Sequence, residues 1–304
     1  MNRLLFAAAF ALLSACTHTP ATKAYGATAA APWEAALADG PKVQVVPLVT
    51  GEIEVAGDFL VDHEHAGLSK RREGKEYVPV LAYLVRHPTA GDFLIDSGFD
   101  HTFAESGSGN FGGLAFLAGF ARQQPGHDTV ALLRGLGVDP AQLKMIVFSH
   151  MHPDHTAGLP DLPKSVPLVA GPDALASYGA PWYAPADHLA GFAEVRTLAL
   201  PASGAVDLFG DGAVLALPTP GHAAGNLSFL LRAEGGPVLL TCDASHTRQG
   251  FDDGVAPGGV EDRPAAEASL AALRRFVAAH PEVRVKAGHE ATDWDLSRGV
   301  QPAL

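Results

Sequence analysis

Short apolar runs recur along most of the chain and are separated by loops rich in Gly, Pro, Asp and His. Most of these runs are too short for helices and are bounded by turn-forming residues, which predicts β-strands. The predicted strands are Val43–Leu48, Glu52–Val55, Val78–Arg86, Asp92–Ile95, Met145–Phe148, Leu168–Ala170, Val195–Leu200, Ala213–Leu217, Leu227–Leu231, Val238–Thr241 and Val283–Ala287.

A few stretches carry the helical spacing of apolar residues instead. The clearest is Arg263–Ala279, and a shorter one, Asp128–Leu136, begins with an N-capping aspartate. Pro172–Tyr178 is a third expected helix. Strand and helix units follow one another in two successive groups, which predicts the α/β fold class. The apolar face of the first helix comprises Leu270, Leu273, Phe276 and Val277.

Three segments show no clear period. Residues 16–41 are rich in Ala, Thr and Pro and are expected to form a flexible tether. The Gly-rich stretch Asp100–Pro125 carries four phenylalanines and is expected to be irregular, either a loop that contributes to the core or a partly apolar flap beside a site. Trp182-Tyr183 lies in a Pro-rich loop, where it would line a pocket or cover the core.

The N-terminus has the pattern of a signal peptide over residues 1–15, because Arg3 precedes the apolar run Leu4–Leu13. That run is too short to span a bilayer. It ends in Leu13-Ser14-Ala15-Cys16, which resembles the lipobox of bacterial lipoproteins. The resemblance implies lipid on Cys16 and attachment to a bacterial membrane on its extracytoplasmic, periplasmic side. Thr17 resembles the residue that sorts lipoproteins to an outer membrane, and an ordinary signal peptide with an incidental cysteine is the alternative.

Charge and cysteine content exclude some classes of protein. The net charge is −12 and no basic block appears, which argues against nucleic acid as a partner. Besides Cys16 the only cysteine is Cys242, so no intramolecular disulfide is expected once Cys16 is modified. Cys242 ends an apolar run and is expected to be a packed core thiol, with Asp243 on the opposite face of the strand.

The stretch His150-Met151-His152-Pro153-Asp154-His155 carries the strongest chemical signal. Its three imidazoles and one carboxylate follow a predicted buried strand, and nitrogen and carboxylate donors at this density suit zinc or a similar divalent metal. A surface histidine cluster is the other reading. A second His-x-His, at Asp62-His63-Glu64-His65, has polar flanks and is expected to be a solvated loop rather than a second metal site.

The His-x-His-x-Asp-His stretch after a strand resembles the signature of the metallo-β-lactamase superfamily. The other sites of that pattern follow in the right order, and the resemblance extends from about Lys42 to the C-terminus. It implies that residues 42–304 form one catalytic domain, a four-layer αβ/βα sandwich with metals at one edge between two sheets. The matching motifs are Asp96-Ser97-Gly98, Thr219-Pro220-Gly221-His222, Leu240-Thr241-Cys242-Asp243 and Ala287-Gly288-His289.

The same resemblance implies a dinuclear metal centre. Asp243 would bridge two divalent ions, for which zinc is favoured and iron, cobalt and manganese are alternatives. The implied reaction is hydrolysis by metal-bound hydroxide at a carbonyl or phosphorus, with Asp154 relaying a proton. One ion would be held by His150, His152 and His222, and the other by Asp154, His155 and His289.

Within the superfamily, this ligand set resembles those of the glyoxalase II thioesterases and the N-acyl homoserine lactone lactonases. The stretch from Leu239 to His246 resembles the lactonase segment Leu-Leu-Thr-x-Asp-Ala-Ser-Tyr. The tyrosine of that segment contacts the lactone carbonyl, and His246 stands in its place. Because imidazole also donates hydrogen bonds, His246 is expected to contact substrate without holding metal.

The most favoured function is therefore opening of the lactone ring of N-acyl homoserine lactones or related small lactones and esters. A thioester or phosphoester hydrolase on the same scaffold is the first alternative. A non-catalytic metal-binding lipoprotein is the second. Both a monomer and a homodimer are compatible with the sequence.

Overall fold

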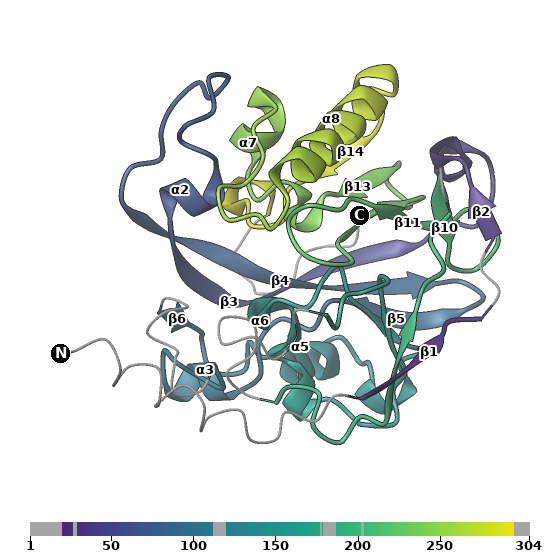
Figure 1. Ribbon diagram of the computed structural model, residues 1–304. Helices are drawn as coiled ribbons and strands as arrows, with labels where there is room; N and C mark the ends of the chain where they lie inside the picture. Colours follow the sequence, from purple (N-terminus) through teal and green to yellow (C-terminus); the bar gives the residue numbers. More distant parts are fainter. Residues whose placement is uncertain are drawn as a thin grey trace.

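The structure, a computed structural model, describes residues 20–26, 29–111, 120–176, 178, 187–201 and 204–294. Two β-sheets lie face to face, and helices cover their outer faces (Figure 1). Among the described residues, none of the helices combines the length and the apolar character needed to cross a membrane.

The larger sheet has eight strands, antiparallel at one end and parallel at the other. The strands are β1 (Ala21–Ala24), β3 (Gln44–Ala56), β4 (Lys75–His87), β5 (Gly91–Ile95), β6 (Ala121–Arg122), β7 (Ile146–Val147), β8 (Leu168–Ala170) and β9 (Glu194–Thr197). Their spatial order is β1-β9-β8-β7-β5-β4-β3-β6.

The smaller sheet has six strands in the order β14-β13-β12-β11-β10-β2. Since β12 is antiparallel to both β11 and β13, and β13 is parallel to β14, the strands β11, β13 and β14 all end at the same edge. The strands are β2 (Ala29–Ala31), β10 (Ala205–Asp207), β11 (Val214–Pro218), β12 (Leu227–Leu231), β13 (Val238–Leu240) and β14 (Arg284–Lys286).

The helices complete the outer layers. The α-helices are α2 (Gly57–Leu60), α3 (Thr102–Glu105), α5 (Thr129–Gly135), α6 (Pro153–Thr156), α7 (Arg248–Asp253) and α8 (Arg263–Ala279). Single 3₁₀ turns are η1 (Trp33–Leu37), η3 (Pro140–Gln142), η4 (Leu159–Asp161), η5 (Cys242–Ala244) and η6 (Ala291–Asp293).

The alternation of side chains along the strands separates the layers. On β12, Phe229 points into the core between the sheets, whereas Leu230 points outward into the cluster beneath α8. The apolar face expected for α8 packs on that cluster through Leu270 and Leu273, and α5 covers the larger sheet through Leu133. The four-layer αβ/βα sandwich expected from the sequence is therefore confirmed (Figure 1).

Residues 16–41 were expected to form a flexible tether, but the described part of this segment forms two short strands and a 3₁₀ turn. Ala21–Ala24 pairs with β9, and Ala29–Ala31 pairs with β10. Trp33 of η1 packs edge-on against Phe276 of α8, with ring centroids 5.3 Å apart. The flexible-tether expectation is wrong for this part, because short Ala-rich segments can join sheet edges through backbone hydrogen bonds alone.

Three other expectations differ in detail. Val43–Leu48 and Glu52–Val55 belong to one strand, β3, with a register shift between Val49 and Gly51. The segment that begins at Pro172 forms turns rather than a helix where it is described, and Asp173 has a φ of 60° that a helix does not allow. The stretch from Asp100 to Pro125 contains the short elements α3 and β6.

The stretch between Asp100 and Pro125 contributes to the core, which was one of the two structures expected for it. Phe103 and Phe111 are fully buried against Phe99, whereas Phe120 is exposed. Phe116, the pair Trp182-Tyr183 and the signal peptide with Cys16 lie outside the described residues.

Candidate metal centre

The ends of β7 and β5 in the larger sheet position the first group of polar side chains. After β7 the chain continues through Ser149 to His150 and His152, and Pro153 then begins α6. Proline is favoured in the first helical turn, so the sequence starts this helix directly after His152. As a result, Asp154 and His155 lie on α6 beside the histidines that precede it.

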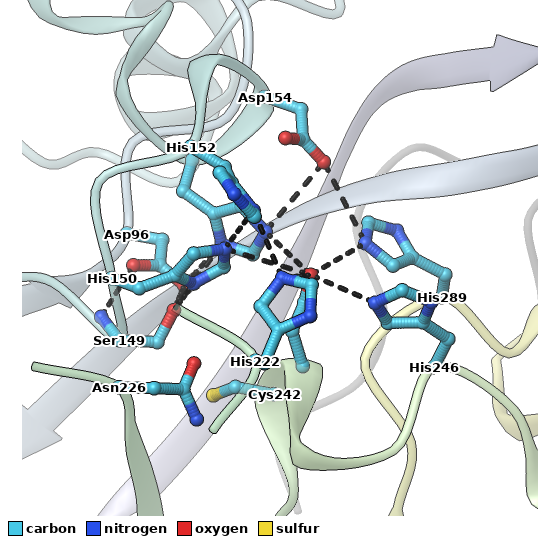
Figure 2. A network of polar contacts seen from close by, with 12 residues as sticks. Asp96, Ser149, His150, His152, Asp154, His222, Asn226, Cys242, His246 and His289 are labelled. Carbon is cyan, nitrogen blue, oxygen red and sulfur yellow. Dashed lines mark hydrogen bonds and ion pairs between the residues drawn. The ribbon is translucent and has the colours of Figure 1, made fainter. Parts of the chain in front are cut away.

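The smaller sheet contributes the second group from the edge where β11, β13 and β14 end. His222 follows β11, Asp243 lies on η5 directly after β13, and His289 follows β14. The two sheets therefore deliver their side chains to one place (Figure 2).

The carboxylate oxygen Oδ2 of Asp243 is the centre of this cluster. The Nε2 atoms that surround it lie at 3.2 Å for His222 and His246, 3.4 Å for His289, 3.5 Å for His155 and 3.6 Å for His150. The Nδ1 atom of His152 completes this side, 2.7 Å from Nε2 of His150 and 2.9 Å from Nε2 of His222. Oδ2 of Asp154 lies 3.5 Å from Nε2 of His155 and 3.6 Å from Nε2 of His289.

These donor atoms form compact groups. Within each group the atoms lie no more than 4.8 Å apart, close enough to share one metal ion. The groups are His150–His152–His222–Asp243, Asp154–His155–His289 and Asp243–His246–His289. The first two match the two ligand sets expected from the sequence, and Asp243 adjoins both.

The chemistry of the cluster fits divalent cations. Within the described part of the chain, Nε2 of His155 and Nε2 of His246 are buried without a hydrogen-bond partner, and they lie 3.5 and 3.2 Å from Oδ2 of Asp243. Buried polar atoms are normally paired, so unpaired donors that face one carboxylate indicate a missing partner of opposite character. Imidazole and carboxylate are the donors that zinc and similar ions prefer.

Contacts behind the donors fix their orientation. Asp96, which follows β5 with a φ of 59°, accepts from the backbone N–H of Ser149 at 2.8 Å, from its hydroxyl at 2.8 Å and from Nδ1 of His155 at 2.9 Å. Nδ1 of His289 donates to the carbonyl of Pro79 at 2.9 Å. Each contact places the hydrogen on Nδ1 and leaves Nε2 free to face the cluster, as outer partners of metal-bound histidines commonly do.

The electrostatics of the cluster favour a negative Asp243 and neutral imidazoles on one side. Burial opposes ionisation of Asp243, but the imidazoles of His289 and His155 hold its pKa well below the usual range. Burial, together with neighbouring imidazoles, holds the pKa values of His150 and His152 well below theirs. Neutral histidine is the form that binds metal.

Two glycines precede donors. Gly221, before His222, has a φ of 127° that favours glycine, and a Cβ atom there would clash with the backbone nitrogen of Ala266. Gly288, before His289, is required by space alone. A Cβ atom there would lie 2.5 Å from the carbonyl oxygen of Cys242 and 2.8 Å from Oδ1 of Asp243.

Other residues singled out in the sequence lie elsewhere or serve the core. Cys242 is a buried free thiol in the core between the sheets, as expected, although Asp243 follows it on a 3₁₀ turn and not on a strand. Among the described residues, His63 and His65 belong to no group of close metal donors. They accept hydrogen bonds from the backbone N–H groups of Arg72 and Gly67.

Three contributions were not foreseen from the sequence. Asp96 was predicted only as part of a turn motif that resembles the one in the family. Its contact with His155 was not predicted, and neither was the hydrogen bond from Ser149 to Asp96. A small polar residue between a buried strand and the first histidine was the available signal for Ser149. His246, expected to contact substrate only, lies within the donor cluster itself.

Comparison with known proteins identifies the family. The family model of the metallo-beta-lactamase superfamily matches residues 77–289. The chain therefore belongs to the metallo-beta-lactamase superfamily. Among its relatives, the N-acyl homoserine lactonase AttM of Agrobacterium fabrum is 30% identical over 228 residues, which cover 73% of this chain and 86% of that protein.

Similar proteins from Bacillus thuringiensis extend the comparison. The N-acyl homoserine lactonase AiiA of its subspecies kurstaki is 27% identical over 227 residues, which cover 73% of this chain and 84% of that protein. A crystal structure of an AiiA variant with N-decanoyl-L-homoserine bound at its active site matches with a TM-score of 0.68 and 21% identity, over 84% of this chain and 96% of that one. This match confirms the fold.

Proposed function

We propose that this protein is a dinuclear metal-dependent hydrolase that opens the lactone ring of N-acyl homoserine lactones. The observation that carries the proposal is the set of imidazoles around Oδ2 of Asp243, at 3.2 to 3.6 Å, with Asp154 beside it. The similarity to lactonases at up to 30% identity over most of their length supports this substrate class.

In this proposal Asp243 would be shared by two divalent cations. His150, His152 and His222 would hold one ion, and Asp154, His155 and His289 would hold the other, in agreement with the two compact groups of donors. Two bound cations would supply hydroxide near neutral pH and stabilise negative charge on oxygen. The residues themselves contribute a fixed, water-excluding frame, since most of the donor side chains are buried.

Asp154 has a separate role in the proposal. Its side chain keeps 17% of its surface exposed, more than the 3% of Asp243, so it is the more accessible of the two carboxylates. We propose that it relays a proton during ring opening, because a carboxylate beside the reacting group can accept and return one.

A substrate panel tests the proposal. The full chain, loaded with Zn²⁺, is assayed on N-acyl homoserine lactones, simple lactones, S-acyl glutathione thioesters and phosphodiesters, and acid release is followed. We expect the highest kcat/KM on the acyl homoserine lactones. A preference for thioesters or phosphodiesters would assign the chain to another branch of hydrolases on this scaffold.

Zinc is the proposed native metal, with iron, cobalt and manganese as alternatives. Support comes from the imidazole-rich donor set, which zinc shares with the other first-row ions. Elemental analysis of protein purified from its own host without added metal would decide between them, and a majority of iron or manganese would overturn the zinc assignment.

We also propose a lipid anchor on Cys16 that holds the protein to a membrane on its extracytoplasmic side. The support is sequence alone: the apolar run Leu4–Leu13 ends at Leu13-Ser14-Ala15-Cys16. In a lipoprotein-processing bacterium, wild type should fractionate with membranes and Cys16→Ala should be soluble and active. Equal partition of the two proteins into the soluble fraction would contradict the anchor.

A further inference from the structure

His246 is placed like a metal donor and not like a residue that only borders the centre. Its Nε2 atom lies 3.2 Å from Oδ2 of Asp243, which equals the distance for His222 and is shorter than the 3.4 Å for His289. The donor atoms of Asp243, His246 and His289 all lie within 4.8 Å of one another. By its distance from Oδ2 of Asp243, His246 resembles the assigned ligands.

The ring nitrogens of His246 also lack other partners. The residue is 7% exposed, and within the described residues neither Nδ1 nor Nε2 has a hydrogen bond. The contact with Asp243 is close but not aligned as a hydrogen bond, which leaves a buried imidazole unsatisfied. A cation between His246 and Asp243 would satisfy both groups.

The orientation of the ring agrees with that of the other donors. The His246 ring lies at 80° to that of His222 and at 78° to that of His289, with centroids 5.0 and 5.2 Å apart. The pair His155 and His289 stands at 81° with centroids 5.8 Å apart. Figure 2 shows His246 and His289 side by side, with both rings facing the centre.

The backbone holds His246 in this position. Its carbonyl accepts from the N–H of His289 at 2.8 Å, and the preceding carbonyl of Ser245 accepts from the N–H of Gly288 at 3.0 Å and from the hydroxyl of Thr241 at 2.9 Å. The segment is therefore fastened to the chain that carries His289, which fixes the backbone from which the imidazole projects.

We infer that His246 is a further protein ligand of the dinuclear centre, bound to the same ion as Asp154, His155 and His289. The inference rests on the metal centre of the proposed function. Two compact donor groups, Asp154–His155–His289 and Asp243–His246–His289, share His289. If both held this ion, it would have five protein donors, more than the four of an ordinary tetrahedral zinc site. The two ions would then be inequivalent, and the second would have fewer positions left for water or substrate.

The inference is tested by measuring metal binding in the absence of substrate. The metal-free full chain is titrated with Co²⁺ in wild type, His246→Ala, His246→Gln and, as a control, His65→Ala. The His65→Ala substitution removes one imidazole from a loop outside the donor groups. Dissociation constants are measured by competition with a chelator, and visible absorption reports the coordination of the bound Co²⁺.

We expect wild type and His65→Ala to bind two ions with the same spectrum. Each His246 variant should bind one ion as before and the second at least about 10-fold more weakly, since even outer partners of ligands contribute 10- to 100-fold. The absorption of the second Co²⁺ should change because its coordination number falls. If one His246 variant does not fold by circular dichroism, the other provides the comparison.

Equal affinities and superimposable spectra in wild type and the His246 variants would show that His246 does not bind metal. Fewer than two ions in wild type would overturn both the dinuclear centre and this inference. If wild type binds two ions with the expected His246 dependence but hydrolyses no lactone, the inference stands and the proposed substrate is wrong.

Discussion

At the scale of single residues, the site depends on one carboxylate that faces both groups of imidazoles. Asp243 is 2% exposed, and the pKa of its carboxyl is held well below the usual range despite burial, because His289, His155 and other imidazoles surround it. In the proposed centre, replacing it would remove the one negative group shared by two cations, which would then repel each other.

Asp243→Ala should therefore lose at least one of two bound ions and lower kcat/KM at least about 100-fold, more than the loss typical of an outer partner. Asp252→Ala, which removes an exposed carboxylate from α7, is the matched control and should bind two ions. Elemental analysis and lactone hydrolysis are measured on both proteins. Two tightly held ions in Asp243→Ala would contradict the bridging role.

Asp96 acts on the centre through His155. Asp96→Asn keeps the size of the side chain but removes the charge and one acceptor oxygen that faces Nδ1 of His155 at 2.9 Å. We expect metal affinity to fall about 10- to 100-fold with the fold intact. Chelator competition measures this, and an unchanged affinity would reduce Asp96 to a turn residue.

His188 gives a residue-scale prediction about pH and stability. Its side chain is buried against Thr156 of α6, 2.9 Å from the hydroxyl, and burial lowers its pKa from 6.5 to about 4. As the pH falls below about 6.5, the imidazole of His188 is protonated in the unfolded chain before it is protonated in the folded one. The contribution of neutral His188 to the free energy of unfolding is therefore present above about pH 6.5 and is lost between about pH 6.5 and pH 4.

The free energy of unfolding of wild type, minus that of His188→Gln, should therefore decrease by about 2 kcal/mol from pH 7 to pH 5. Because both proteins share every other titrating group, the difference isolates His188. Chemical denaturation at several pH values measures it, and a difference that stays constant across the range would refute a buried neutral His188.

Much of the site was predictable at this scale, because the donors follow strand ends in a fixed order of motifs. Ser149 and the contact between Asp96 and His155 were not, since their partners lie 53 and 59 residues away in sequence. The placement of His246 was also missed. A histidine in place of a tyrosine suggests substrate contact, and only the fold shows its distance from Asp243.

At the scale of elements, the centre depends on how closely β14 and η5 approach. Gly288→Ala would place a Cβ atom 2.5 Å from the carbonyl oxygen of Cys242 and 2.8 Å from Oδ1 of Asp243. The clash must move either the end of β14 or the carboxylate of Asp243. We expect weaker binding of both ions, seen by chelator competition.

Gly135→Ala is the control for this substitution, because no atom beyond its chain neighbours and the backbone of its own helix lies within 4 Å of its Cβ position at the end of α5. It should bind both ions as wild type does. If Gly288→Ala also binds metal with unchanged affinity, the close approach of β14 does not shape the centre.

The sequence pattern predicted most strands and helices correctly where the segment was strongly apolar. The bounds predicted for the amphipathic α8 and for β12 are those of the structure, and most other buried strands were predicted with small errors at their ends. The missed strands β1 and β2 have a common physical cause. Both are short and lack large apolar side chains, and they owe their pairing to sheet edges formed by distant residues, which local sequence does not reveal.

At the scale of the whole molecule, the fold explains why two halves of the chain are needed for one site. Strands β5 and β7 of one sheet and β11, β13 and β14 of the other end at the same edge, and each provides donors or their supporting contacts. The core between the sheets holds these ends in register, so neither half contains a complete centre.

The most direct test of this account is the rate of N-hexanoyl homoserine lactone hydrolysis by the full chain loaded with two equivalents of Zn²⁺, compared with the metal-free chain and Asp243→Ala. We predict saturable ring opening by the loaded wild type and loss of at least about 100-fold in both comparisons. Wild type that holds two ions yet opens the ring no faster than the metal-free chain would contradict the proposed lactonase function.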